Sequence, residues 1–248
     1  MSRFLLIYIL LFAVTFTSHS QVTLSEQSKI SLLTSTPYDD EVFTPYGHTS
    51  IRVVDAEHAL DLLFNYGYFN LEKPHFIYRF VKGETDYLLR AYDTRYYITD
   101  AVMTGFGITE QVLNLNQEEK QAFWEALVLN AQPENAEYRY NFFYDNCSTR
   151  PADLIERFAG GEVIYDFPEM HLSFRDLINY CTRNKPWQTL GCDLVLGAPT
   201  DDEITPRETF FLPEYLKNAL ATAKTITSDG ADRPVVAETH ILVEETRE

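Results

Sequence analysis

An alternation of apolar and polar positions predicts a β-hairpin near the start of the chain. Apolar side chains alternate with polar ones in residues 44–54 and again in residues 59–66, and the polar stretch 55–58 separates the two runs. A period of two is typical of strands that bury one face, and a short polar stretch between two such runs indicates a turn. We therefore expect two paired antiparallel strands.

The same alternation predicts the register of this hairpin. If the turn is centred between residues 56 and 57, Ile51 lies opposite Leu62 on one apolar face. The other face then carries His48 opposite Asn65. Directly opposed side chains have Cβ atoms about 5 Å apart, so the Asn65 amide is expected within reach of the His48 ring.

Helical and strand signals continue along the rest of the chain. Helix starts with acidic first turns or capping residues, followed by apolar residues on one side, predict three helices. The first covers residues 116–130, the second begins after residue 150 and ends at Gly160 and Gly161, and the third covers residues 173–182. We also expect a strand over 85–92, a short helical or extended segment over 73–80, and loops with short elements over 194–199 and 206–216.

The two ends of the chain differ from this pattern. Residues 1–20 have one basic residue, Arg3, an uncharged apolar run and a small-x-small site before Gln21, which is typical of a cleaved secretory signal. An uncleaved anchor is the alternative. Residues 224–248 are polar and acidic, so we expect a tail or linker. One globular domain is expected over residues 21–223, since the chain of 248 residues is 45% apolar.

Charge and cysteine content narrow the classes of function. The formal net charge is −17, which argues against nucleic acid as a partner and against electrostatic docking on an anionic membrane. Contact with lipid would have to come through apolar and aromatic surface. Export permits disulfides, and Cys181 and Cys192 lie close enough in sequence to pair, unless both are reduced and buried. Cys147 would then be the odd thiol.

Cys147 is the candidate nucleophile. It follows an aromatic run and a polar turn and stands directly before a helical pattern with Leu154, Ile155 and Phe158 on one face. A thiol at a helix N-terminus is close to free N–H groups and to the positive end of the dipole, which favours its thiolate. The same N–H groups can hold an oxyanion. The alternative is that Cys147 is a small buried apolar residue.

A thiolate nucleophile needs a base and a group that orients the base. Of the six histidines, only His48 falls on a predicted strand with a polar partner on the same face. Cys147, His48 and Asn65 are therefore the preferred catalytic set, with Asp61 as an alternative orienting residue, although the register pairs Asp61 with Arg52. The alternative for His48 is a structural role. We expect no metal and no cofactor, because zinc-type spacings and phosphate or dinucleotide loops are missing.

Four stretches of the sequence resemble one known family. They are Tyr46-Gly47-His48-Thr49, Phe64-Asn65-Tyr66-Gly67, residues 80–87, and the long stretch of residues 140–150 that contains Asp145-Asn146-Cys147-Ser148. Together they resemble the Lnb N-terminal periplasmic domain family, and residues 194–199 and 211–216 resemble its closing segment. The resemblance covers about residues 25–220.

The resemblance implies a fold and a reaction. The fold would be α+β, a circularly permuted papain-like (NlpC-type) fold in which an antiparallel sheet with the His packs against the helix with the Cys. The reaction would be lipoprotein N-acyl transfer in the periplasm of Bacteroidetes-type bacteria. An acyl chain would pass from a phospholipid to Cys147 as a thioester and then to the α-amino group of a diacylated lipoprotein. His48 would be the general base and acid, and Asn65 would orient it.

Two questions about this function stay open in the sequence. Acyltransferases of the family commonly continue into C-terminal membrane helices, and this sequence contains no such helix. We therefore expect a soluble periplasmic form, a truncated relative with changed activity, or a separate membrane partner that supplies the anchor. The alternative functions are a papain-like cysteine hydrolase acting on an amide and a non-catalytic binding domain on the same fold. An apolar groove of Phe142, Phe143, Tyr66 and Tyr68 near Cys147 would favour the acyl chain.

Overall fold

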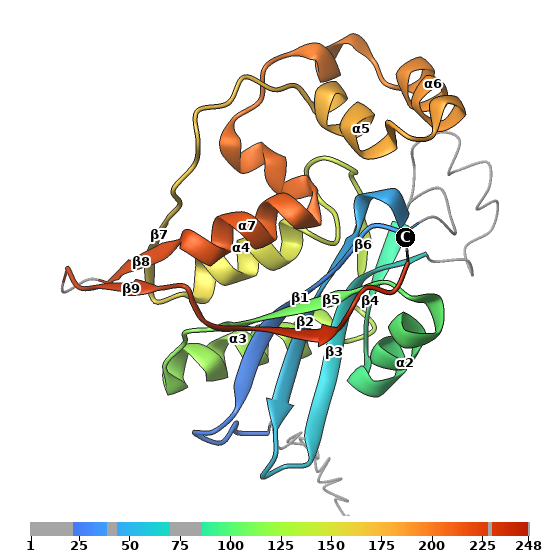
Figure 1. Cartoon of the computed structure of the whole chain (residues 1–248). Helices are drawn as coiled ribbons and strands as arrows, with labels where there is room; N and C mark the ends of the chain where they lie inside the picture. Colours follow the sequence, from blue (N-terminus) through green and yellow to red (C-terminus); the bar gives the residue numbers. More distant parts are fainter. Residues whose placement is uncertain (1–21, 39–43, 70–85, 228–229, 248) are drawn as a thin grey trace, which may run out of the picture.

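A seven-stranded antiparallel sheet lies at the centre of the computed structural model, which describes residues 22–38, 44–69, 86–227 and 230–247 (Figure 1). Within these residues the strand order is β10-β5-β1-β2-β3-β4-β6. The strands are β1 (Lys29–Ser35), β2 (His48–Asp55), β3 (Leu60–Phe69), β4 (Asp86–Asp93), β5 (Ile108–Leu113), β6 (Glu137–Arg139) and β10 (Val236–Val243). A smaller sheet joins β7 (Gly161–Ile164), β8 (Lys224–Thr227) and β9 (Asp232–Pro234).

Helices pack against both faces of the main sheet. The α-helices are α2 (Thr94–Thr104), α3 (Gln117–Asn130), α4 (Thr149–Phe158), α5 (Phe174–Thr182), α6 (Pro186–Val195) and α7 (Pro213–Thr222). Short 3-10 helices are η1 (Thr44–Tyr46), η2 (Ala198–Asp201) and η3 (Pro206–Phe211). Figure 1 shows α4 and α7 above the sheet and α5 and α6 beyond them.

The alternation along each strand separates two cores. Ile51 and Phe64 belong to the larger core, which contains side chains of α3, α4 and α7. Leu63 belongs to a second core on the opposite face, with Ala101 of α2 and Phe106 after it. The predicted antiparallel sheet with His48 therefore packs against α4, the helix that follows Cys147. The α+β class is confirmed.

The predicted hairpin is present, but its register differs by two residues. β2 and β3 pair with Ile51 opposite Phe64 instead of Leu62. The turn contains four residues, because the buried Asp55 carboxylate accepts hydrogen bonds from Glu57 N (3.1 Å) and His58 Nδ1 (2.9 Å). Since the shift is even, every side chain stays on its predicted face. His48 and Asn65 therefore meet diagonally across the strands.

Most other predicted elements agree with the structure. Asn116 and Ser173 cap α3 and α5, each in a capping box, α4 ends just before Gly160, and β4 corresponds to the predicted strand 85–92. The strand predicted from residue 44 begins only at His48, because η1 precedes it. The predicted signal segment and residues 73–80 lie outside the described residues.

The prediction of a polar tail or linker from residue 224 is wrong. β8 and β9 extend the small sheet, and β10 pairs with β5 at the edge of the main sheet. Most side chains of β10 are exposed, so its polar sequence suits an edge strand that is attached through backbone hydrogen bonds. An acidic composition therefore did not distinguish an edge strand from a linker.

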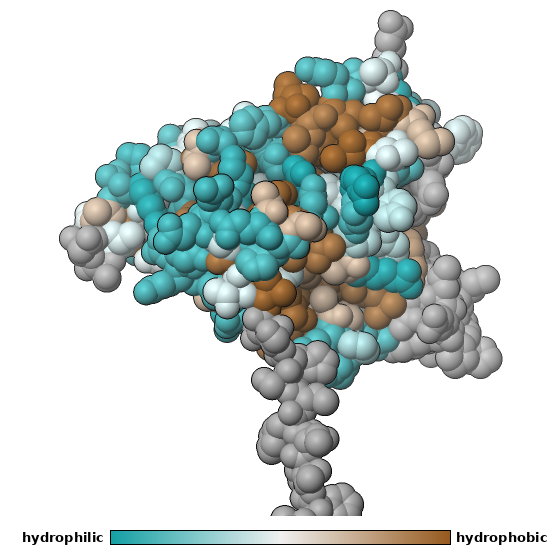
Figure 2. All heavy atoms as spheres, turned by 90° about the horizontal axis from the view of Figure 1, so that it is seen from below, coloured by the Kyte–Doolittle hydropathy of each residue, from teal (hydrophilic) through white to brown (hydrophobic). Residues whose placement is uncertain are grey.

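Apolar side chains at the surface are confined to local patches. In the view of Figure 2, polar residues cover most of the left half of the molecule, and apolar residues gather toward the upper edge. A charge of −17 is consistent with a largely polar surface. A run of exposed apolar residues is thus a local feature that needs its own explanation.

Candidate active site

The first residue of β2, His48, hydrogen-bonds to Asn65 of β3. His48 Nε2 lies 2.7 Å from Asn65 Oδ1, and because an amide oxygen only accepts, Nε2 is the donor. Gly47 leads into the strand with φ of +74°, and a Cβ there would lie 2.8 Å from the carbonyl oxygen of Ser35. The chain thus enters β2 at a position where only glycine fits. Because Asn65 binds Nε2, the other ring nitrogen of His48, Nδ1, is available to a different partner.

The amide of Asn65 is itself fixed on its other side. Asn65 is 8% exposed, and its Nδ2 donates to Tyr92 Oη at 3.1 Å. Tyr92 lies on β4, and its ring packs edge-to-face on Tyr68 with centroids 5.9 Å apart. Tyr92 therefore holds the amide with its oxygen toward His48. Sequence reasoning missed this residue, since nothing distinguishes it among the sixteen tyrosines of the chain.

Cys147 lies in the turn that leads into α4. Thr49, the residue after His48, donates its hydroxyl to the backbone carbonyl of Cys147 at 2.5 Å, which ties the turn to β2. The thiol is half-buried and free, it lines the same cavity as His48 and Asn65, and His48 is close enough to act on its pKa. The structure therefore brings the three predicted residues, Cys147, His48 and Asn65, into one cluster.

Burial and charge act in opposite directions on this cluster. Burial raises the pKa of Cys147, but the charge and hydrogen bond of His48, with backbone hydrogen bonds including that of Thr49, outweigh it and lower the thiol pKa below its ordinary value. Burial lowers the pKa of His48, but the Cys147 charge and the hydrogen bonds to Cys147 and Asn65 raise it above its ordinary value. These opposite shifts favour a thiolate–imidazolium pair, which combines a nucleophile with a proton donor.

Asn146 fixes the shape of the turn around the thiol. Its side chain is 2% exposed, and its Nδ2 donates to the carbonyls of Phe142 and Phe211, each at 2.8 Å. Its Oδ1 accepts from the backbone N–H groups of Ser148 (2.7 Å) and Thr149 (2.9 Å). Asn146 thus engages both N–H groups. The oxyanion donors expected at the start of α4 must therefore be N–H groups other than those of Ser148 and Thr149.

A cavity of about 260 Å³ opens beside the cluster. Half of its twenty lining residues are aromatic, and Cys147, His48 and Asn65 lie in its wall. The aromatic residues are Tyr38, Tyr46, Tyr68, Phe69, Tyr87, Tyr92, Tyr97, Tyr140, Phe142 and Phe211. Asp100 is its only carboxylate among the described residues. Such a wall suits an apolar ligand with one polar end at the thiol.

Two of the four side chains expected around an acyl chain contribute to this cavity. Phe142 and Tyr68 line it. Phe143 instead packs on Phe174 with ring centroids 4.2 Å apart. Tyr66 is buried on the opposite face of the sheet, where its hydroxyl accepts from Asn130 Nδ2 at 3.0 Å. The pairing of β3 with β4 is irregular between Tyr66 and Tyr68, so these two side chains, two positions apart, do not share a face as they would in a regular strand.

The remaining candidates have other partners. Asp61 forms an ion pair with Arg52, with Oδ2 and Nη2 2.6 Å apart, so it does not orient His48. The other described histidines pair with carboxylates: His58 with Asp55, His171 with Glu203 and His240 with Glu238.

Cys181 and Cys192 are free thiols without a disulfide. Among the described residues, no group of three or more His, Cys, Asp or Glu side chains is placed to hold a metal ion.

Comparison with known proteins gives one match. The family model of the Lnb N-terminal periplasmic domain matches residues 21–178, which include all three residues of the cluster. Residues 194–199 and 211–216, which we also compared with that family, lie beyond the matched range. Neither the curated proteins nor the solved structures gave a match. In the part of the chain that the structure describes, no helix is long and apolar enough to cross a membrane. The chain belongs to the Lnb N-terminal periplasmic domain family.

Proposed function

We propose that this protein is a thiol-dependent acyltransferase that moves a phospholipid acyl chain through a Cys147 thioester to the α-amino group of a diacylated lipoprotein. The observation that carries the proposal is the position of His48 between Cys147 and Asn65 in the wall of an aromatic cavity. The cluster supplies the chemistry and the cavity supplies room for the chain. The predicted signal segment and the family of periplasmic domains support the periplasm as its location.

In the first step, the Cys147 thiolate attacks the carbonyl carbon of the ester. The new C–S bond forms as the ester C–O bond breaks, and the His48 imidazolium gives its proton to the departing alkoxide. The products are a thioester on Cys147 and a lysophospholipid. Asn65, which accepts from Nε2, keeps the other ring nitrogen directed at the reacting groups.

In the second step, the free amine of the lipoprotein attacks the thioester carbon. A C–N bond forms and the C–S bond breaks, and the neutral His48 takes the proton that the amine loses. The protonated ring again faces a thiolate, so the pair returns to its starting state. The same cluster serves both half-reactions.

The proposal includes a circularly permuted papain-like arrangement. The strand with His48 precedes the helix that follows Cys147 in the chain, which is the order that a permuted papain-like fold would have. The antiparallel pairing of the sheet and its packing on α4 support this reading. A diacylated lipoprotein and a separate membrane partner remain the expected macromolecular partners.

The intact mass of the mature protein after incubation with phospholipid vesicles tests the first step. We expect a mass gain of one fatty acyl group that hydroxylamine removes, because hydroxylamine cleaves thioesters. Cys147→Ala should gain nothing, and His48→Ala should acylate slowly or not at all. Cys181→Ala is a matched control that removes another free thiol and should behave like the wild type.

The second step needs a diacylated lipopeptide with a free amine. Adding it to the acylated protein should return the protein to its original mass and give a triacylated peptide. Release of free fatty acid alone, with no acyl group on the peptide, would favour hydrolysis. An unreactive Cys147 with every lipid would contradict the proposal and favour a binding role.

A further inference from the structure

Helix α6 presents an apolar face that nothing in the described chain covers. Trp187, Leu190, Leu194 and Val195 are 84%, 48%, 78% and 85% exposed, respectively, and no residue of α6 is buried. The spacing i, i+3, i+7, i+8 places these side chains on one side of the helix. Exposed apolar side chains on one helix face indicate a surface that contacts another apolar phase.

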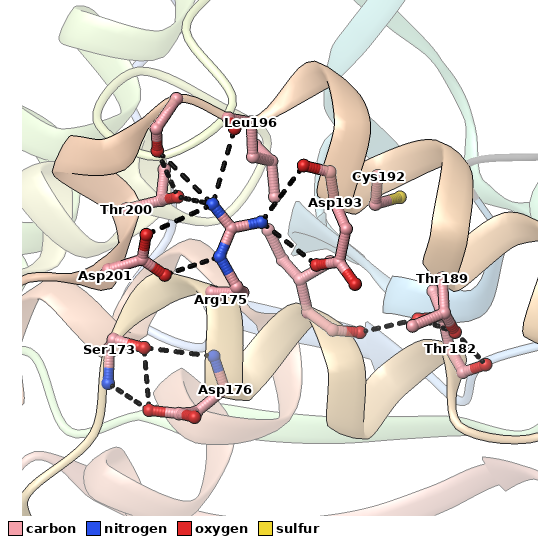
Figure 3. A network of polar contacts seen from close by, with 12 residues as sticks. Ser173, Arg175, Asp176, Thr182, Thr189, Cys192, Asp193, Leu196, Thr200 and Asp201 are labelled. Atoms are coloured by element: carbon pink, nitrogen blue, oxygen red, sulfur yellow. Dashed lines mark hydrogen bonds and ion pairs between the residues drawn. The ribbon is translucent and has the colours of Figure 1, made fainter.

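The opposite, polar side of α6 is fixed to its neighbours. Arg175 of α5 donates from Nη1 to Asp193 Oδ1 at 3.0 Å and from Nε to Asp201 Oδ1 at 2.5 Å (Figure 3). Figure 3 also shows Thr189 of α6 bonded to Thr182 of α5, with the two hydroxyls 2.9 Å apart. These contacts hold the helix with its apolar side outward, so the exposure does not result from a loosely attached segment.

The inner side of α6 adjoins the cavity of the candidate active site. Cys192 Sγ lies 3.6 Å from Tyr46 Oη. Tyr46 lines the cavity, and its ring packs edge-to-face on Phe142 with centroids 5.1 Å apart. A surface that binds to α6 is therefore brought next to the cavity that contains Cys147.

Two basic residues directly precede α6, while the carboxylate within the helix, Asp193, is paired with Arg175. The turn before the helix carries Arg183 and Lys185, in a chain with a net charge of −17. The Arg183 guanidinium lies 4.1 Å from the centroid of the half-exposed Tyr180 ring. Tryptophan, tyrosine and basic residues beside an aliphatic helix face are the combination that favours the interface of an anionic bilayer. A protein partner would not require the flanking cations.

We infer that α6 is an interfacial helix that docks this protein on a lipid surface and brings the cavity to the membrane. The apolar face would enter the acyl boundary, while Arg183 and Lys185 would contact the phosphate groups. This inference rests on the proposed function in taking a membrane lipid as the acyl donor. It resolves the difficulty that the acidic chain as a whole is poorly attracted to anionic lipid.

Sedimentation with vesicles of phosphatidylethanolamine and phosphatidylglycerol tests the surface. Trp187 is the exposed reporter, since the other tryptophan, Trp124, is 5% exposed in the core. We expect the wild type to bind the vesicles with a blue shift of its emission. The double variant Trp187→Ser, Leu194→Ser should bind the vesicles on the order of tenfold more weakly than the wild type, since two apolar side chains no longer enter the lipid.

Leu129→Ser is the matched control. Leu129 is 53% exposed on α3, so this change removes an exposed leucine away from α6 and should leave binding unchanged. Thermal unfolding of the double variant should match the wild type, since both altered side chains are exposed. Equal vesicle binding by the double variant and the wild type would overturn the inference, as would no binding by the wild type, which would favour a protein partner.

Acylation measurements separate this inference from the proposed chemistry. Cys147→Ala should bind vesicles like the wild type. If Cys147 gains no acyl group while binding through α6 persists, the chemistry fails and the surface stands. If vesicle lipid acylates the double variant as fast as the wild type, the surface fails and the chemistry stands.

Discussion

The His48 ring lies directly against Gly67, so closely that a side chain at residue 67 would meet it. A Cβ built on Gly67 would lie 3.0 Å from His48 Cε1 and 3.4 Å from Asn65 Oδ1. Gly67 is the residue two positions beyond Asn65 on the same face of β3. Its lack of a side chain provides the space in which the His48–Asn65 hydrogen bond forms.

Gly67→Ala should therefore displace the His48 ring by a few tenths of an ångström. Because small displacements of a catalytic group reduce rates strongly, we expect Cys147 acylation to slow about tenfold. The fold should persist, as the strand keeps its backbone pairing. The matched control is Gly197→Ala after α6, where a Cβ makes only an ordinary van der Waals contact, 3.5 Å from Pro199 Cδ. Wild-type acylation by Gly67→Ala would show that the ring has more freedom than this contact implies.

Tyr92→Phe removes the acceptor of the Asn65 amide but keeps the ring that lines the cavity, so we expect its effect to come through Asn65. Losing one such hydrogen bond corresponds to about 1 kcal/mol, or roughly a fivefold fall in the maximal acylation rate, with little change in the lipid concentration that half-saturates the protein. Tyr96→Phe removes a hydroxyl from a side chain that is 73% exposed and should change nothing. A Tyr92→Phe effect confined to lipid affinity would mean that the Tyr92 hydroxyl acts on the ligand from the cavity wall and not through Asn65.

The opposite pKa shifts of Cys147 and His48 predict the pH dependence of thiol alkylation. The alkylation rate by iodoacetamide follows the thiolate fraction, so it rises as pH increases through the thiol pKa. Because His48 lowers that pKa, the rise should occur below the pH expected of an ordinary cysteine. In His48→Gln only burial and the backbone hydrogen bonds remain, so the rise should move to higher pH and alkylation at mildly acidic pH should slow. Identical profiles would exclude the ion pair.

The sequence predicts the site better than it predicts the strand register around it. Side-chain parity alone places His48 and Asn65 on one face, and that conclusion is unaffected by an even shift. The two-residue shift itself depends on the Asp55 carboxylate, which widens the turn through bonds to Glu57 and His58. A pattern of apolar positions contains no information about such a local hydrogen-bond arrangement.

Contacts distant in sequence account for what the pattern missed. Tyr92 supports Asn65 from the next strand of the sheet, and no local signal points to it. Asn146 directly precedes Cys147 in a turn, where asparagine is a usual residue, so its position beside the candidate nucleophile was the signal that could have identified it. The edge strand β10 was hidden because most of its side chains are exposed and its pairing with β5 is made by backbone groups.

The turn between β2 and β3 also predicts how stability depends on pH. The Asp55 side chain is fully buried. It accepts from Ser25 N at 2.7 Å, from Ser25 Oγ at 2.8 Å and from His58 Nδ1 at 2.9 Å. Burial raises the pKa of Asp55, but these hydrogen bonds outweigh it and hold the pKa well below its usual range. The carboxylate therefore stabilises the fold above its unfolded-state pKa of about 3.9, and this contribution is lost as pH falls toward the lower folded-state value.

Asp55→Asn should accordingly reduce the free energy of unfolding by about 2 kcal/mol at neutral pH, because a buried amide cannot replace the charged acceptor toward both Ser25 donors. The difference from the wild type should shrink as pH falls below about 3.9, where the Asp55 carboxylate of the unfolded chain begins to protonate while that of the folded protein stays charged. Denaturant unfolding at neutral and acidic pH measures both effects. Glu57→Gln, an exposed carboxylate in the same turn, should change stability by less than about 0.5 kcal/mol. A difference between Asp55→Asn and the wild type that stays constant with pH would mean that packing, not the charge, accounts for the loss.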